Sequence, residues 1–236
     1  MSRRPVHLLA GEPVAERVIA VGDPGRARLL AGLLEESRLV SDNRGLLVFN
    51  GKWRGVPVTV ATHGMGAPSA LIVFEELAML GAKVIVRLGT AGGIPGRAGP
   101  GDIVVASSAS MLRHGCGLEA YLPRIVPPLS PDPRLTLLLA EKLSAAGLRV
   151  VVGPVFCSDS FYAETGLLEE LERAGIVAVE MEAAALFALS HMRGFRAAAA
   201  FVVSNTLGGE FLDPGRLASM ASLAGRRVLD ALVEYD

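Results

Sequence analysis

Residues 83–93 read KVIVRLGTAGG, an apolar stretch that contains one arginine, Arg87, and runs directly into a glycine-rich segment. Lys83–Leu88 predicts a buried β-strand, because short apolar runs bounded by glycine are typical of strands covered on both faces. In α/β sheets, ligands bind at the carboxyl ends of the strands, where loops and helix N-termini meet. We therefore expect Arg87 and the glycine-rich segment after it to lie at a binding site.

The rest of the chain alternates between strand and helix patterns on both sides of this stretch. Further strands are predicted at residues 17–21, 46–53, 56–62, 103–106, 148–155, 176–179 and 197–203. Helices are predicted at residues 26–36, 133–146, 165–174 and 181–192, and also after a cap at Ser69 and from Pro214 onward. This alternation predicts a single α/β domain over residues 1–236, with a mixed central β-sheet flanked by helices.

The composition excludes several classes of protein. The 236 residues are 51% hydrophobic and carry a formal net charge of −1, which favours a folded enzyme-sized domain and gives no basic excess for a nucleic-acid partner. No apolar run approaches the roughly 18 residues of a membrane span, and the N-terminus lacks a signal-peptide pattern, so a cytoplasmic location is expected. The two cysteines, Cys116 and Cys157, and four scattered histidines predict no metal site, and whether the cysteines form a disulfide stays open.

Two arginines lie beside glycines at predicted strand ends. The turn GDPGR at residues 22–26 enters a helix, whose N–H groups and dipole favour an anion, although an ordinary turn with a surface Arg26 has the same features. Arg87 lies late in an apolar strand, where an unpaired guanidinium is unfavourable, so it pairs with an internal carboxylate or with a bound anion. One phosphate held by Arg87, by Thr90 and by the turn at Gly22 explains all of these features.

Two common nucleotide-binding patterns do not fit the sequence. The Gly-Lys-Ser/Thr ending of a P-loop is absent, and Gly64-Met65-Gly66 is followed by Ser69 where a dinucleotide fingerprint has glycine or alanine. The strand before these glycines is also one arm of a predicted hairpin. A dinucleotide-dependent enzyme is therefore disfavoured.

Further polar side chains follow later strands. Glu180-Met181-Glu182 opens an apolar helix, where carboxylates commonly stabilise the N-terminus, but one could instead accept hydrogen bonds from sugar hydroxyls with Met181 beneath the ring. Phe161 either belongs to the core or stacks on a planar base. Asn205, at the end of an apolar strand, is either a turn residue or a partner for the edge of a heterocycle.

Together these motifs resemble the trimeric and hexameric nucleoside phosphorylases, a family that includes bacterial-type purine nucleoside phosphorylase, uridine phosphorylase and archaeal methylthioadenosine phosphorylase. The resemblance covers nearly the whole chain, and its six motifs follow the order found in the family. They are GDPGRA at 22–27, NRG at 43–45, THGMG at 62–66, RLGTAG at 87–92, SDSFY at 158–162 and VEMEA at 179–183.

The resemblance implies a role for each matching residue. Phosphate would be bound by Gly22, Arg26, Arg87 and Thr90, together with an Arg44 that each subunit lends to its neighbour. Ribose would be bound by Met65, Met181, Glu182 and a His7 donated across the same interface. The base would be bound by Ala91, Gly92, Phe161, Val179, Glu180 and Asn205. Catalysis would depend on Arg87, Glu182 and Asn205, in a homo-oligomer expected to be a hexamer, a trimer of dimers with shared active sites.

The resemblance also bears on base specificity. Members that accept 6-aminopurines carry Asp where this chain has Asn205, whereas Asn occurs in members acting on 6-oxopurines and in uridine phosphorylases. The uracil-binding Gln and Arg of uridine phosphorylases lie in an insertion for which residues 163–175 leave no room. A 6-oxopurine preference is therefore predicted, with uridine phosphorylase and methylthioadenosine phosphorylase as alternatives. Arg216 is a candidate partner for Asn205.

The implied reaction is reversible phosphorolysis of the N-glycosidic bond, which gives a free base and ribose 1-phosphate. It needs no metal or organic cofactor, because inorganic phosphate is a co-substrate. Two other classes remain as alternatives. A hydrolytic nucleosidase would use water and a carboxylate base in place of phosphate and arginines, and a nucleoside-binding protein would release no base.

Overall fold

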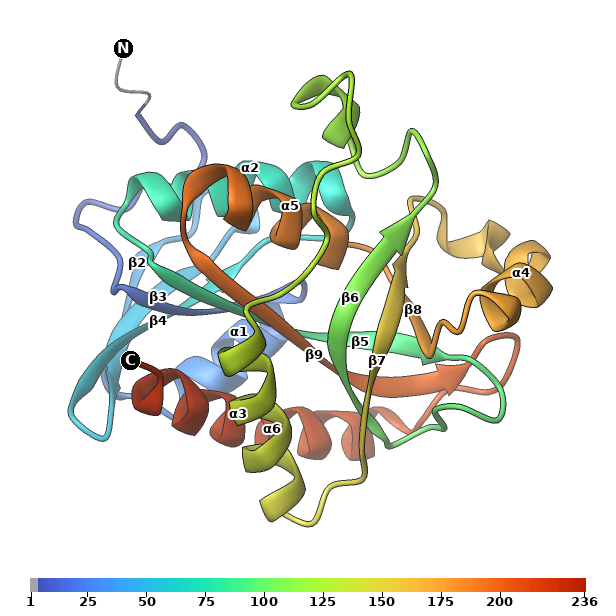
Figure 1. The fold of residues 1–236 in the computed structure, drawn as a ribbon. Coiled ribbons are helices and arrows are strands. Elements are labelled where there is room, and N and C mark those ends of the chain that lie inside the picture. The colour runs from blue at the N-terminus through green and yellow to red at the C-terminus, as the bar shows by residue number, and fades with distance from the viewer. Residues whose placement is uncertain (1–3) are drawn as a thin grey trace.

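The computed structural model describes residues 4–236 and joins nine strands in one mixed sheet (Figure 1). The strands are β1 (Arg17–Val21), β2 (Glu35–Ser41), β3 (Val48–Trp53), β4 (Val56–Thr62), β5 (Val84–Gly93), β6 (Ile103–Met111), β7 (Val150–Cys157), β8 (Ala178–Glu180) and β9 (Arg196–Thr206). The helices are α1 (Pro24–Ala31), α2 (Ala67–Met79), α3 (Pro133–Ala145), α4 (Leu168–Arg173), α5 (Ala183–Arg193) and α6 (Pro214–Glu234). Short 3-10 helices are η1 (Asn43–Gly45), η2 (Leu118–Ala120) and η3 (Phe161–Leu167). The predicted mixed α/β fold is confirmed.

The long strand β5 connects two differently shaped parts of the sheet. The order is β2-β3-β4-β1-β5-β8-β7-β6-β9, and β5 also pairs with β9, so that five strands close into a ring. The glycines that we expected to form a loop after residue 88 lie inside β5, and Gly92 and Gly93 pair with β8. A Cβ at Gly93 would overlap the carbonyl of Ala98, which explains why a glycine stands within this strand. The sequence pattern did not predict this closure.

The largest error of the sequence analysis is at residues 26–36, predicted as one helix. Helix α1 ends at Ala31, and Glu35–Ser41 forms the edge strand β2, which pairs antiparallel with β3. The leucine and glutamate pattern suits a helix, but hydrogen bonding to β3 overrides that local preference. The predicted cap at Ser69 is also wrong. Helix α2 begins after Gly66, and the Ser69 hydroxyl donates to the carbonyl of His63.

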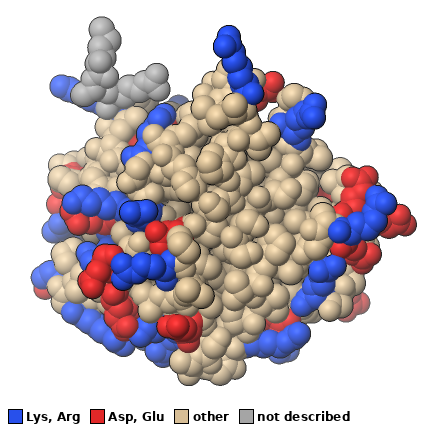
Figure 2. Space-filling model, viewed as in Figure 1, with Lys and Arg blue, Asp and Glu red and all other residues tan. Residues whose placement is uncertain are grey.

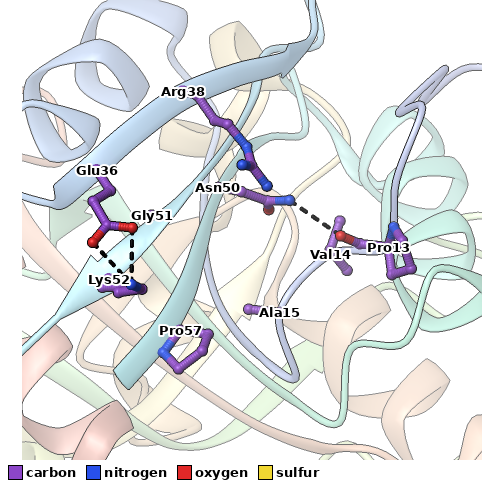
Figure 3. Close-up of a pocket in the computed structure, with 9 residues that line it drawn as sticks. All are labelled: Pro13, Val14, Ala15, Glu36, Arg38, Asn50, Gly51, Lys52 and Pro57. Atoms are coloured by element: carbon purple, nitrogen blue, oxygen red, sulfur yellow. Dashed lines mark hydrogen bonds and ion pairs between the residues drawn. The ribbon is translucent and has the colours of Figure 1, made fainter. Parts of the chain in front are cut away.

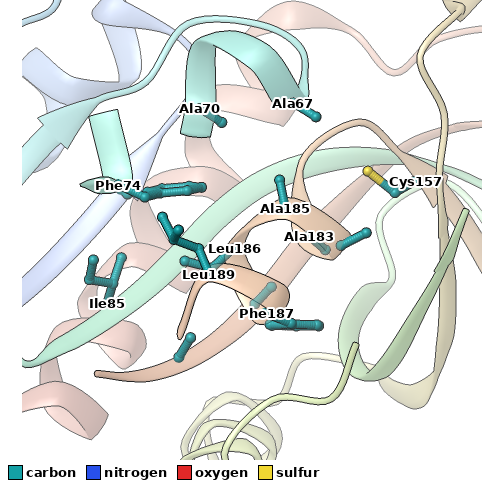
Figure 4. Packing of buried hydrophobic residues seen from close by; sticks show 14 of the residues in the cluster. Ala67, Ala70, Phe74, Ile85, Cys157, Ala183, Ala185, Leu186, Phe187 and Leu189 are labelled. Atoms are coloured by element: carbon teal, nitrogen blue, oxygen red, sulfur yellow. The ribbon is translucent and has the colours of Figure 1, made fainter. Parts of the chain in front are cut away.

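Helix α5 packs between α2 and the sheet (Figures 1 and 4). Its residues 183–190 are all buried, and four of them are alanines that lie among large side chains such as Leu186 and Phe187. The small residues let α5 approach its neighbours closely on every side, where they meet Phe74 of α2 and Ile85 of β5 in one apolar cluster. This packing fixes the start of α5 at the carboxyl end of β8.

Cys116 and Cys157 are both buried and both free. The Sγ of Cys116 donates to the Sγ of Cys157 at 3.0 Å, and the N–H of Cys116 donates to Asp159. The two thiols therefore join the segment after β6 to the end of β7 without a covalent bond.

The surface shown in Figure 2 carries charges of both signs, mainly at its margins, around a broad uncharged area. This face has no concentrated basic area of the kind that nucleic-acid binding proteins present. Among residues 4–236, no helix has both the length and the apolar character needed to cross a lipid bilayer.

Candidate active site

The centre of the candidate site is Arg87, which extends from β5 toward the start of α5. It is 4% exposed, and its Nη2 donates to Oε2 of Glu182 and lies 3.7 Å from Oε2 of Glu180. The guanidinium also lies over the ring of Phe201, 4.9 Å from the centroid. Burial acts to lower the pKa of Arg87, but the charges of Glu182 and Glu180 outweigh it and raise the pKa. Arg87 is therefore a permanent positive charge in the interior.

Two of the three guanidinium nitrogens of Arg87 have no partner. Nε and Nη1 are buried and make no hydrogen bond with any residue that the structure describes. Nη1 occupies the space that a Cβ at position 89 would fill, so Gly89 is required beside it. Thr90, half-buried, follows on the same strand. Since buried N–H groups are unfavourable when unsatisfied, these nitrogens indicate a site for an anion.

Arg26 brings a second guanidinium to the same place. Asp23 caps α1 by accepting from the backbone N–H of Arg26 at 2.6 Å, just after Gly22, and Nη1 of Arg26 donates to the carbonyl of Leu88 at 3.5 Å. Burial lowers the pKa of Arg26, and the positive charge of Arg87 lowers it further. Two like charges held together at a helix N-terminus favour an anion between them.

Glu180 and Glu182 have different roles at the start of α5. The Glu180 carboxylate accepts from the N–H groups of Glu182 and Ala183 at 2.8–3.0 Å, so it stabilises the helix N-terminus. Burial raises its pKa to about 7. Glu182 accepts from Arg87 and, at 2.6 Å, from the N–H of Gly66. Burial acts to raise the pKa of Glu182, but Arg87 and the other donors outweigh it and lower the pKa. Glu182 is therefore the ionised carboxylate of the pair.

The strand ends beside this cluster bring several residues predicted to contact a base close together. Gly92 on β5 pairs with Val179 on β8 and lies opposite Asn205 on β9. The hydroxyl of Ser204 donates to Oδ1 of Asn205 at 3.0 Å, and Nδ2 of Asn205 donates to the carbonyl of Thr206 at 2.9 Å. These bonds fix the orientation of the amide and use one of its two N–H groups.

Three other residues that the sequence analysis singled out lie on or beside β5, α5 and α6. Ala91 is buried beside Gly92, and Met181 is half-buried between the two glutamates. Arg216 lies in the first turn of α6, where its Nη2 is 3.7 Å from the position of a Cβ at Gly101. The Asn205 amide bonds its two neighbours in β9 and not Arg216, so the expected pairing with Arg216 is not observed.

Other predicted residues lie at the surface. The side chain of Met65 is 85% exposed and that of Phe161 is 52% exposed, and Arg44 is exposed on η1 with a φ of 57°. None of the three packs into the core. The ring of Phe161 packs edge-on against that of Tyr162, with 5.1 Å between the centroids, and the predicted contacts of all three residues with substrate stay predictions.

His7 lies on the same side of the molecule as Arg44. Its Nδ1 is 2.8 Å from Oε1 of Glu76, whose carboxylate also accepts from the backbone N–H groups of Val6, His7 and Leu8. The side chain of Asn43, next to Arg44, donates to the carbonyl of His7 at 2.8 Å. Burial acts to raise the pKa of Glu76, but these donors outweigh it and lower the pKa. The buried carboxylate thereby fixes the N-terminal segment against α2.

Comparison with known proteins identifies the family. A sequence profile of the phosphorylase superfamily matches residues 16–234. The chain belongs to the phosphorylase superfamily. It is 32% identical to a uridine phosphorylase of Thermococcus kodakarensis, over 94% of this chain and 84% of the relative. It is 34% identical to a guanosine phosphorylase of Halorubrum lacusprofundi (88% and 85%) and 38% identical to a DeoD-type purine nucleoside phosphorylase of Jannaschia sp. (82% and 83%). The predicted resemblance to nucleoside phosphorylases is confirmed.

The structure of this phosphorylase superfamily member contains one group to which sequence reasoning gave no role. His63 is completely buried beside the cluster, and neither ring nitrogen makes a hydrogen bond with a described residue. Burial lowers its pKa to about 3, with a further decrease from Arg87, and Glu182 and the Gly64 carbonyl oppose this only in part. A histidine at the end of an apolar strand, immediately before a glycine-rich turn, was the sequence signal that could have identified it.

One surface pocket lies away from this cluster. It has a volume of about 280 Å³ and is lined by residues of β2, β3 and β4 and by Pro13, Val14 and Ala15 (Figure 3). Its charged side chains are already paired, because Arg38 bonds Glu12 and Lys52 bonds Glu36. None of the described residues lining this pocket has a buried polar atom without a hydrogen-bond partner, whereas Arg87 has two such atoms.

Proposed function

We propose that this chain catalyses the reversible phosphorolysis of 6-oxopurine ribonucleosides, in which nucleoside and phosphate give free base and ribose 1-phosphate. The observation that carries the proposal is Arg87, which is buried and bonded to Glu182 while two of its nitrogens lack a partner. A structural ion pair would leave fewer buried N–H groups unsatisfied. An oxyanion beside Arg87 and a sugar beside Glu182 would use both side chains.

Phosphate would bind between Arg87 and Arg26, with the N–H groups near Gly22 and the hydroxyl of Thr90 as further donors. It acts as the nucleophile at the anomeric carbon. As the glycosidic bond lengthens, positive charge develops on the ribose, and the phosphate carries the compensating negative charge. The arginines hold it in position, so that most of the rate enhancement comes from orientation and electrostatics.

Ribose would bind with its 2′ and 3′ hydroxyls on Glu182, whose lowered pKa keeps it an acceptor. The N–H of Gly66 holds one carboxylate oxygen in position. Met181 would lie beneath the sugar. His7 and Arg44 would reach the site of a neighbouring subunit, which makes the functional unit at least a dimer and, in the form we expect, a hexamer of three dimers.

The base would lie beside Gly92, with the amide of Asn205 donating to its edge and stabilising the charge that develops on the leaving group. A neutral amide cannot transfer a proton, so the base departs as an anion or takes a proton from water. The chemistry proposed here uses no metal or organic cofactor. Phe161, exposed on η3, would pack on the base once substrate is bound.

Uridine is the second candidate substrate, because one relative at 32% identity is a uridine phosphorylase. The shortness of the segment 163–175 supports a purine instead. A panel of inosine, guanosine, adenosine, methylthioadenosine and uridine, each with and without phosphate, tests the proposal. We expect base release from inosine and guanosine only with phosphate. Release without phosphate would indicate a nucleosidase, binding without release a nucleoside-binding protein, and fastest release from uridine a uridine phosphorylase.

A further inference from the structure

His63 is a buried polar group that the reaction proposed above does not use. It lies at the end of β4 with no exposed surface, and its ring packs against Phe74 of α2, with 5.4 Å between the centroids. Both ring nitrogens are buried, and neither makes a hydrogen bond of ordinary geometry with a described residue, although the Gly64 carbonyl lies close enough to raise the pKa of the ring. Each is a strong hydrogen-bonding group, and a folded protein rarely leaves such groups unsatisfied in its interior unless a ligand uses them. The ring therefore requires an explanation beyond packing.

The position of the ring relates it to the anion site. A Cβ at Gly22 would be 3.5 Å from Cε1 of His63, and Cε1 is the ring carbon between the two nitrogens. The nitrogen-bearing edge of the ring thus faces the Gly22 turn. Among the charged groups near the ring, Arg87 has the strongest effect on its pKa, followed by Glu182, so the ring also lies close to the Arg87–Glu182 pair. His63, the Gly22 turn and Arg87 are therefore close to one another.

The charge state of His63 suits that place. The pKa of the ring, lowered to about 3 mainly by burial, keeps it neutral above about pH 4. A cationic side chain would be repelled by Arg87 and Arg26, whereas a neutral imidazole adds an N–H donor without adding a third positive charge. Its second nitrogen is an acceptor, which matches an oxyanion that still carries one proton.

We propose that His63 is a further ligand of the phosphate, donating one ring N–H to a phosphate oxygen beside Arg87. This inference rests on the proposed phosphorolysis. It adds a residue from β4 to a site otherwise formed by the Gly22 turn, α1 and β5. Through this bond His63 would lower the KM for phosphate without contacting the nucleoside.

The test uses three variants of the full chain and one control. His63→Leu removes both nitrogens and keeps most of the volume, while His63→Asn and His63→Gln place an amide N–H near the position of Nδ1 or Nε2. Leu77→Val, a core change one turn along α2 from Phe74, controls for loss of packing. For each, we would measure the KM for phosphate, the KM for inosine, and the increase in Tm caused by inorganic phosphate.

We expect His63→Leu to raise the KM for phosphate about tenfold, as for one lost hydrogen bond, and to reduce the phosphate-induced increase in Tm. The KM for inosine stays unchanged. The Tm without phosphate should stay the same or rise, because an unsatisfied buried polar group has been removed. At least one amide variant should return the KM for phosphate to within threefold of the parent, and Leu77→Val should lower Tm while leaving this KM unchanged.

Several results would overturn the assignment. One is a KM for phosphate within threefold of the parent in His63→Leu. Another is an equal increase of the KM for phosphate in both amide variants. This second result would also overturn the assignment if the His63→Leu variant does not fold. A rise in the KM for inosine alone would indicate that His63 contacts the ribose and not the phosphate. These results differ from failure of the proposed function, in which the parent protein itself would release base without phosphate or not at all.

Discussion

The buried and exposed parts of the candidate site are held in different ways. Arg87, Glu182 and Asn205 are fixed by hydrogen bonds to other residues of the same chain, and the two charged side chains are bonded to each other. Met65 and Phe161 lie at the surface with large exposed fractions. A buried charge is stable only when it is paired, so the geometry of the buried part is set by folding. If the proposed function holds, the exposed part is completed by a ligand or by a second subunit.

This difference gives the two parts different sensitivities to substitution. In the buried part, removing Arg87 also leaves Glu182 without its charged partner, so under the proposed function one substitution would damage both the phosphate and the ribose contacts. In the exposed part, an altered Arg44 would affect only the neighbouring site to which the proposed function assigns it. Substitutions should therefore separate the two parts by size of effect and by whether a second chain can restore activity.

The largest effect is expected for Arg87→Ala. Loss of a buried, charge-assisted contact to an anion costs about 2–5 kcal/mol, so kcat/KM for phosphate should fall by roughly a thousandfold. Steady-state kinetics at varied phosphate measures this. Arg38→Ala is the matched control, because Arg38 is also bonded to a carboxylate, Glu12, but lies in the exposed pocket of Figure 3. It should change kcat/KM less than twofold.

Arg87→Ala also unpairs the buried Glu182, so the fold must be checked by circular dichroism at the assay temperature. A folded Arg87→Ala variant whose KM for phosphate stays within threefold of the parent would remove Arg87 from the phosphate site. The buried and exposed parts of the site would then not differ in their sensitivity to substitution.

The exposed part is tested by mixing inactive chains. If Arg44 is donated to a neighbouring subunit, a dimer of one Arg44→Ala chain and one Glu182→Ala chain contains one intact site and one doubly defective site. Random exchange then restores about a quarter of the parental activity. The measurement is activity after co-refolding, with exchange verified by differently tagged chains. Each variant refolded alone should stay inactive, and no recovery in exchanged mixtures would mean that each chain forms its own site.

The same contrast explains how much could be predicted from sequence. That Arg87 and the GDPGR turn form a candidate anion site could be predicted, because a charge in an apolar strand and glycines before a helix each have few physical explanations. The role of Glu180 as a helix cap was one of two alternatives derived from its position, and its hydrogen bonds support that alternative. Glu182 had the same local signal, and only the fold shows that it reaches Arg87.

Contacts between distant segments could not be predicted in this way. Strand β2 was predicted as helix because its partner β3 is not visible in a local pattern. The closing of β5 onto both β8 and β9 likewise depends on pairings far apart in the chain. His7 and Arg44 had no local signal at all. Their roles come from resemblance, and the structure adds only that His7 is tied to Glu76.

The pH dependence of stability gives a test confined to the buried part. Burial raises the pKa of Glu180 from the ordinary 4.5 to about 7, so the folded chain binds this proton more tightly than the unfolded chain. The stability contributed by this group is complete below about pH 4.5 and is lost as the pH rises through about 7. We expect Glu180→Gln to flatten that decline in the free energy of unfolding, measured by denaturant titration at pH 5, 6, 7 and 8.

Glu169→Gln on α4, at an exposed glutamate, should leave the decline unchanged. If Glu180→Gln follows the same pH dependence as the parent, Glu180 does not titrate in this range, and the buried part of the site is less strongly desolvated than the structure indicates.

The smallest effect concerns Asn205, at the border between the buried and exposed parts. Its amide suits the 6-oxo group or N7 of hypoxanthine and guanine, whereas adenine as a leaving group gains most from protonation at N7. An aspartic acid whose pKa is raised by burial can supply that proton, and an asparagine cannot. Asn205→Asp should therefore raise kcat/KM for adenosine relative to inosine by roughly tenfold, as for one hydrogen bond of about 1.4 kcal/mol, and the gain should fade at high pH as the carboxylate ionises. An unchanged ratio would show that the side chain bonded to Ser204 and Thr206 does not face the base.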